Sequence, residues 1–125
     1  MSKVKLVRGF TGYTYIEGHC GDVAKVLTHL KDVYGRDTSD VNDALRILSN
    51  FNSFYDMMRR KFKDFISPKK DEGDLIKGLV VVDKIKLFKI GNVSYVQLIF
   101  DKRVGLELIS NILKDLGIDF EVTYE

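Results

Sequence analysis

The C-terminal third of the chain, from Lys84 to Glu125, constrains the fold more than any other stretch. Two apolar runs rich in β-branched residues, 85–90 and 93–100, flank the dipeptide Gly91-Asn92. Glycine and asparagine tolerate the positive φ that a two-residue turn requires. The two runs are therefore predicted to form a β-hairpin, and its connection is short enough to allow only antiparallel pairing.

A helix and a last strand are predicted after the hairpin. Asp101 occupies a suitable N-cap position, and apolar residues recur at helical spacing from Val104 to Leu116. Gly117 suits the left-handed position that follows a helix. Residues 118–124 then alternate apolar and polar side chains, which is the period of a half-buried strand. The acidic side chains on its outer side favour an edge position, because charge there discourages pairing with other chains.

The N-terminal part predicts one strand and one amphipathic helix. Residues 3–8 alternate lysine with apolar side chains and indicate a short strand, which residues 13–16 can resume as a second arm. Residues 18–21 form a glycine-containing loop. The spacing of apolar residues then predicts a helix over 22–34, with Asp22 as its N-cap.

The middle of the chain predicts helices and then a strand. Apolar residues recur every three or four positions from Val41 to Phe65. Residues 49–53 are weak helix formers, so this stretch is either one bent helix or two helices. Pro68 ends the helical region, because proline disfavours helical geometry in the residue before it. The apolar run 79–82 begins a strand that leads into the hairpin.

These elements predict a single α+β domain over residues 1–125. The order is βαββαβ, the ferredoxin-like or split βαβ arrangement, with a helical insertion at about 39–67 between the first helix and the second strand. We expect an antiparallel sheet of about four strands with two helices on one face. The other face would present Val93, Tyr95, Gln97 and Ile99 or their neighbours, covered by the inserted helices or by a second subunit. Such a fold does not specify a function.

Composition indicates a cytoplasmic protein with no membrane partner. The N-terminal residues lack the apolar core of a secretory signal, and the chain has no run of about 18 apolar residues. The single cysteine, Cys20, excludes an internal disulfide and fits a reducing compartment. The net charge is only +2, so local clustering of charge carries more information than the total.

The clearest functional signal is a cluster of cations. It comprises Arg59, Arg60, Lys61, Lys63, Lys69 and Lys70 within twelve residues. Lys77, Lys84, Lys86 and Lys89 continue the bias. Clustered cations attract a phosphate backbone, and aromatic side chains among them can stack on bases. Phe62 and Phe65 are interleaved here, although their spacing favours a place in the core. The alternative is a solvated helix end whose cations complement the helix dipole.

A second candidate site combines Cys20 and His19 at the junction between strand and helix. A helix N-terminus and a neighbouring imidazolium both lower the pKa of a thiol, as a nucleophile requires. Adjacent residues in an extended chain point in opposite directions, however, so His19 is poorly placed as a base for Cys20. Paired ligand motifs such as Cys-x-x-Cys are absent from the sequence, and we therefore predict no metal and no cofactor.

The sequence favours a small non-enzymatic binding or regulatory protein that contacts nucleic acid through the basic cluster. It does not distinguish RNA from DNA. One alternative is a protein-binding adaptor or inhibitor that uses the sheet face or the edge strand 118–124, with a homodimer formed through the same surface. A second alternative is a small enzyme with Cys20 as its nucleophile.

Overall fold

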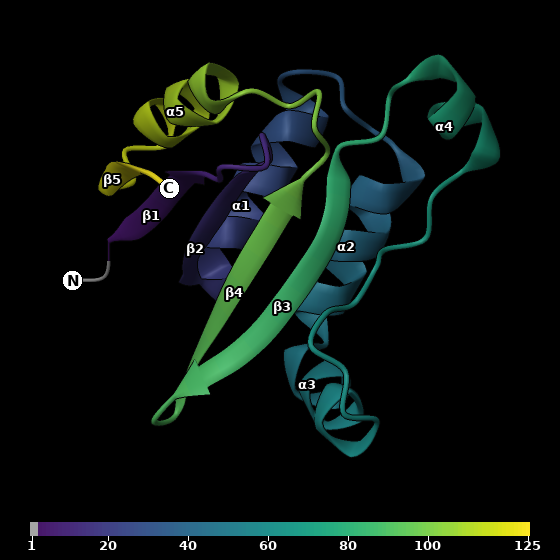
Figure 1. The fold of residues 1–125 in the computed structure, drawn as a ribbon, viewed down its shortest axis with the longest axis vertical. Coiled ribbons are helices and arrows are strands. Elements are labelled where there is room, and N and C mark those ends of the chain that lie inside the picture. The colour runs from purple at the N-terminus through teal and green to yellow at the C-terminus, as the bar shows by residue number, and fades with distance from the viewer. Residues whose placement is uncertain (1–2) are drawn as a thin grey trace.

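The computed structural model describes residues 3–125 as a sheet with helices packed on one side (Figure 1). The strands are β1 (Val4–Arg8), β2 (Thr14–His19), β3 (Val82–Ile90), β4 (Val93–Phe100) and β5 (Phe120–Tyr124). The helices are α1 (Cys20–Asp32), α2 (Ser39–Ser49), α3 (Phe51–Arg60), α4 (Glu72–Lys77) and α5 (Leu106–Asp115). The α+β class predicted from the sequence is confirmed.

The sheet is mixed and has five strands in the order β3-β4-β2-β1-β5. Neighbouring strands are antiparallel except for β1 and β5, which are parallel. The predicted ferredoxin-like order with about four antiparallel strands is therefore wrong in detail. The reason is local: Gly9 N–H donates to Tyr13 O at 2.8 Å, and Gly12 has a φ of +94°. This turn makes β1 and β2 two separate paired strands, so that β1 lies between β2 and β5.

The C-terminal third follows the sequence prediction closely. The β3–β4 hairpin is antiparallel, and Gly91 has a φ of +63° at its turn. Gly117 has a φ of +67° after α5, and β5 forms an edge of the sheet. The prediction that this strand is half-buried is wrong, because only Phe120 of β5 is partly buried. The start of α5 differs from the prediction. Asp101 Oδ1 accepts a hydrogen bond from Arg103 N–H at 3.0 Å and stabilises a turn, so the helix begins later, at Leu106.

Helices α1, α2 and α5 cover a single face of the sheet. On β4, Val96, Leu98 and Phe100 are fully buried against the helices, while the alternating residues Tyr95 and Ile99 are partly exposed. Figure 1 shows α1 and α2 together behind β3 and β4, with α3 continuing beyond α2. The expectation that the inserted helices cover the second face is therefore wrong, because they extend the first helical layer.

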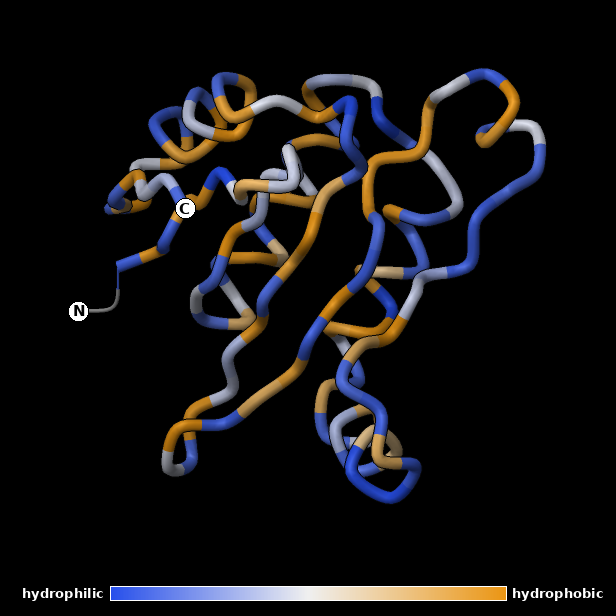
Figure 2. Tube along the Cα trace, in the orientation of Figure 1, coloured by the Kyte–Doolittle hydropathy of each residue, from blue (hydrophilic) through white to orange (hydrophobic). Residues whose placement is uncertain are grey.

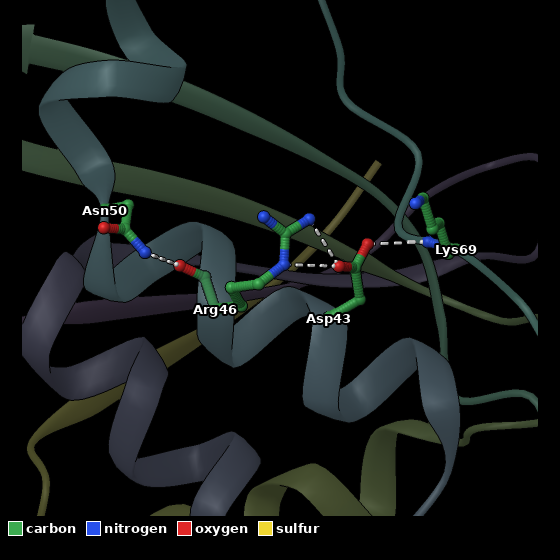
Figure 3. A network of polar contacts seen from close by, with 4 residues as sticks. All are labelled: Asp43, Arg46, Asn50 and Lys69. Atoms are coloured by element: carbon green, nitrogen blue, oxygen red, sulfur yellow. Dashed lines mark hydrogen bonds and ion pairs between the residues drawn. The ribbon is translucent and has the colours of Figure 1, made fainter.

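The helical insertion contains two helices broken at one residue. Asn50 has φ −118° and ψ 40°, outside the helical region, and it joins α2 to α3. Its side-chain Nδ2 donates to Arg46 O at 2.9 Å, which satisfies a carbonyl at the end of α2 (Figure 3). An asparagine side chain that competes for backbone hydrogen bonds thus separates the two helices. This decides between the two alternatives that the sequence left open.

The start of α2 is tied to the sheet by a buried carboxylate. Asp40 is 0% exposed, and its Oδ2 accepts hydrogen bonds from Val81 N–H at 2.7 Å and Val82 N–H at 2.6 Å. These two donors lie at the beginning of β3, after the long connection from α3. The position of α2 on the sheet is therefore fixed by a side chain that bridges residues distant in sequence.

A second carboxylate holds the chain that returns from α3 toward β3. Asp43 accepts from Arg46 Nε at 2.9 Å and from the backbone N–H of Lys69 at 2.8 Å (Figure 3). Burial raises the pKa of the Asp43 carboxyl, but the Lys69 hydrogen bond and the Arg46 ion pair outweigh burial and lower that pKa. Further along the sheet edge, Ile66 exchanges two backbone hydrogen bonds with Ile85 of β3, at 2.7 and 2.8 Å.

Candidate nucleic-acid interface

Helix α3 ends in a tight cap that places an aromatic residue in an unusual conformation. Lys63 N–H donates to Met58 O at 3.0 Å, and Phe62 N–H donates to Arg59 O at 3.3 Å. This pair of bonds is the Schellman arrangement, which requires a left-handed residue and normally uses glycine. Here Phe62 takes that position with a φ of +52°. A residue with a Cβ atom pays about 1–2 kcal/mol for this conformation.

The Phe62 side chain is displayed to solvent. It is 95% exposed, so the prediction that Phe62 belongs to the core is wrong. The spacing that suggested burial continues from Met58, but α3 ends at Arg60 and the chain turns away before Phe62. Phe65 is partly buried, and Lys84 Nζ lies 4.6 Å from the centroid of its ring. The two phenylalanines therefore have different environments despite their closeness in sequence.

Four of the predicted cations surround Phe62. We call Arg59, Arg60, Lys61, Phe62 and Lys63 the α3 tip. All five side chains are exposed, and within residues 3–125 none of the four cations lies within ion-pair distance of a carboxylate. Figure 2 shows that the chain around the end of α3 is predominantly hydrophilic. Asp56 lies near Arg59 and Arg60, and Asp64 lies near Lys63, but neither forms an ion pair with them. The α3 tip therefore combines an excess of positive charge with an exposed ring.

Lys69 and Lys70 do not belong to this surface. The chain carries them back along α2, where Lys69 donates its backbone N–H to Asp43. The Lys70 ammonium donates to Asp83 O at 3.0 Å and to Pro68 O at 3.4 Å, so it stabilises the connection leading into β3. The prediction that Lys69 and Lys70 share a surface with the α3 tip is therefore wrong, because the chain reverses direction after α3.

Two lysines of β3 stand near the α3 tip in place of Lys69 and Lys70. A shallow depression of about 490 Å³ is lined by Tyr55, Arg59, Phe62, Lys63 and Lys86, with Met58, Asp64 and Leu87. Lys89 Nζ lies 5.0 Å from the centroid of the Tyr55 ring, and Arg59 Cζ lies 5.8 Å from it. The faces of aromatic rings attract cations at such distances. Tyr55 thus helps to hold cations from α3 and β3 near one another.

The second candidate site does not assemble. Cys20 Sγ lies 3.5 Å from Leu48 O, and burial raises the pKa of the thiol. That direction is opposite to the activation that a cysteine nucleophile requires. His19 points elsewhere and packs its ring against Tyr95, with the ring centroids 4.7 Å apart. In the described part of the chain, no three His, Cys, Asp or Glu residues are grouped so that they could hold a metal ion.

Comparison with protein-family models, with curated proteins and with solved structures finds no significant match to this chain. Between residues 3 and 125 no helix has both the length and the apolar character needed to cross a membrane.

Proposed function

We propose that this protein is a non-enzymatic binding protein that contacts nucleic acid through the α3 tip. The observation that carries the proposal is Phe62, which is 95% exposed in a left-handed conformation between cations. Within residues 3–125 the Phe62 ring is not buried, so no packing offsets the cost of the left-handed conformation. Contact with a base would bury the ring and explain why it is exposed.

The chemistry of the α3 tip matches a phosphate backbone. Arg59, Arg60, Lys61 and Lys63 carry four positive charges that are exposed and unpaired within residues 3–125. Each phosphate contact releases condensed counterions, so the affinity of such a surface falls steeply as salt rises. A base stacked on an aromatic side chain adds about 1–3 kcal/mol, largely independent of its identity. We therefore expect weak sequence preference and strong salt dependence.

The test measures fluorescence anisotropy of labelled RNA and DNA oligonucleotides at two salt concentrations. The triple variant R59A/R60A/K61A should bind at least tenfold more weakly, and its negative slope of log affinity against log salt should become shallower by about 2–3 units. The matched control K25A/K77A/K114A removes the same charge from exposed lysines elsewhere and should retain most of the affinity. Absence of binding at low salt, or equal losses in both variants, would overturn the proposal.

A second candidate function is the binding of a protein strand at β5. This strand ends the sheet, and its apolar residues Val122 and Tyr124 are 41% and 71% exposed. An extended segment of another protein, or β5 of a second copy, could add to such an edge through backbone hydrogen bonds. Sedimentation velocity across a concentration range tests the dimer. A concentration-dependent dimer that V122K/Y124K abolishes would support it, and a monomer at every concentration would exclude it.

A further inference from the structure

An aromatic row crosses three strands on the face of the sheet that the helices leave open. Phe88 of β3 pairs with Tyr95 of β4, and Tyr95 pairs with His19 of β2. The rings of Phe88 and Tyr95 are nearly parallel, at 15°, with centroids 5.6 Å apart. His19 extends the row at 4.7 Å from Tyr95. The three rings form a continuous row at the hairpin end of the sheet.

The aromatic row is not part of the core. All three side chains are only partly buried, whereas Val96, the neighbour of Tyr95 on β4, is 0% exposed on the opposite face. Cross-strand aromatic pairs do stabilise sheets. The three side chains nevertheless keep part of their surface exposed to solvent, and an unpaired base can stack on an exposed aromatic surface.

Charge is distributed unevenly over this open face. Lys84 and Lys86 of β3 lie in the register rows beside the aromatic row, since Lys86 pairs with Gln97 and Lys84 with Ile99. The register row of Lys86 continues through Glu17 of β2 and Lys5 of β1 to Glu121 of β5, and Glu125 follows β5. Lysines without an acidic partner in the register lie at the β3 edge, so a polyanion is attracted to that edge more than to the rest of the face.

The α3 tip and the aromatic row meet across the edge of β3. Lys86 lines the same depression as Phe62 and Lys63. Lys86 also lies two residues before Phe88, which is about 7 Å along a strand and places both side chains on one face. Cations and rings thus continue from the end of α3, over β3, to the middle of the sheet.

We propose that the nucleic acid is single-stranded and passes from the α3 tip over β3 at Lys86 onto the aromatic row. This inference rests on the proposed function and deepens it by naming the ligand class. The cations hold the phosphates, and Phe62, Phe88 and Tyr95 stack on bases. A duplex keeps its bases stacked inside the helix and cannot use the rings, whereas the bases of a single strand turn outward onto them.

The test compares a labelled single strand of twelve nucleotides with a duplex of the same length. Replacing Tyr95 with leucine (Y95L) should weaken single-strand binding about tenfold and leave duplex binding unchanged. The control variant Y34L removes an exposed ring that follows α1, outside the aromatic row and the α3 tip, and should bind like the wild type. The triple variant R59A/R60A/K61A should weaken the binding of both ligands, because both carry phosphates.

These outcomes separate the two proposals. If the wild type binds neither ligand, both proposals are wrong. If the wild type binds both ligands equally and Y95L changes neither affinity, the proposed function stands and the single-strand inference is wrong. Displacement of the oligonucleotide by polyglutamate at equal charge concentration would also overturn it, because a polypeptide polyanion would then suffice.

A crosslinking experiment on the wild-type protein avoids dependence on the folding of Y95L. A single strand containing 4-thiouridine is irradiated in the complex, and the crosslinked peptides are identified by mass spectrometry. We expect crosslinks to peptides that contain Phe62, Phe88 and Tyr95. Crosslinks confined to the helical face or to β5 would overturn the proposed path.

Discussion

The two ends of the α2–α3 arm place residues in opposite environments. At its start a charged residue, Asp40, is completely buried. Just beyond its end an apolar residue, Phe62, is almost completely exposed. Charged side chains are rarely found fully buried, and large apolar residues normally contribute to a core. Only a few turns of helix separate the two exceptions.

The difference between them is whether the fold compensates for the exception. Asp40 Oδ2 accepts two hydrogen bonds, at 2.6 and 2.7 Å, from backbone N–H groups that would otherwise be buried without partners, whereas Oδ1 has no partner within residues 3–125. Phe62 gains no comparable contact, and its left-handed conformation opposes folding. A local exception that the fold does not compensate is the kind of feature that indicates function.

The largest effect is expected at Asp40. Replacing Asp40 with alanine (D40A) leaves the Val81 and Val82 N–H groups without acceptors and should lower the free energy of unfolding by about 4 kcal/mol. Urea denaturation followed by circular dichroism measures the loss. The variant D40N keeps an acceptor oxygen and should lose less. A D40A protein within 1 kcal/mol of wild type would show that these hydrogen bonds contribute little to stability.

Asp43 is a second carboxylate whose burial is offset by hydrogen bonds, and its contribution to stability depends on pH. The pKa of this carboxyl is lowered in the folded state, so the stabilisation it gives is present above the unfolded value of 3.8 and is lost as pH falls below it. Replacing Asp43 with asparagine should cost about 1–2 kcal/mol at pH 7 and reduce the loss of stability between pH 5 and 2. Thermal melts across this range measure both effects. D32N, at an exposed carboxylate, is the control; identical acid sensitivity in D43N and wild type would contradict the prediction.

Phe62 tests the opposite case. Replacing it with glycine relieves the left-handed strain and should raise the free energy of unfolding by about 1 kcal/mol, while nucleic-acid binding weakens. Denaturation and anisotropy on the same preparation measure the two quantities. A stabilised protein with reduced affinity would sharpen the contrast with Asp40. A destabilised protein would mean that Phe62 makes folding contacts after all.

Tyr15 is partly buried and has one side-chain hydrogen bond, and we expect its replacement to change stability less than the replacements above. Burial and a 3.0 Å hydrogen bond to Glu125 raise the pKa of its phenol to about 12. Its contribution to stability is therefore complete below pH 10 and is lost as pH rises toward 12. Absorbance titration near 295 nm should show a tyrosine that ionises late, and the variant Y15F should lack that phase. Late ionisation that persists in Y15F would assign it to another residue.

The parts of the fold that depend on local signals were predictable from the sequence. The turn at Gly91 and the helix end at Gly117 both need left-handed glycines, and the structure has them there. The parallel pairing of β1 with β5 was not predictable in the same way, because no local pattern specifies a partner so distant in sequence. The break between α2 and α3 stayed open because the residues around Asn50 favour neither alternative strongly.

The candidate site was predictable only in part. The cations of the α3 tip were found by composition, but Lys69 and Lys70 were grouped with them because a sequence shows neighbours and not the reversal of the chain. Phe62 was assigned to the core because its spacing from Met58 is helical. Helix α3 ends at Arg60, so the helical spacing does not extend to Phe62. No glycine or proline near Arg60 indicates this end in the sequence. The register of Phe88, Tyr95 and His19 depends on pairing across strands.

The position of β1 has a consequence for the order in which the chain folds. Its first partner, β2, follows after a short turn, so this hairpin can form within microseconds of the residues becoming available. Its second partner, β5, is separated by more than a hundred residues, and closing such a loop is entropically expensive. One edge of β1 therefore waits, unpaired, until nearly every other element exists. During synthesis on the ribosome, that edge of the nascent protein stays open to pairing with other chains.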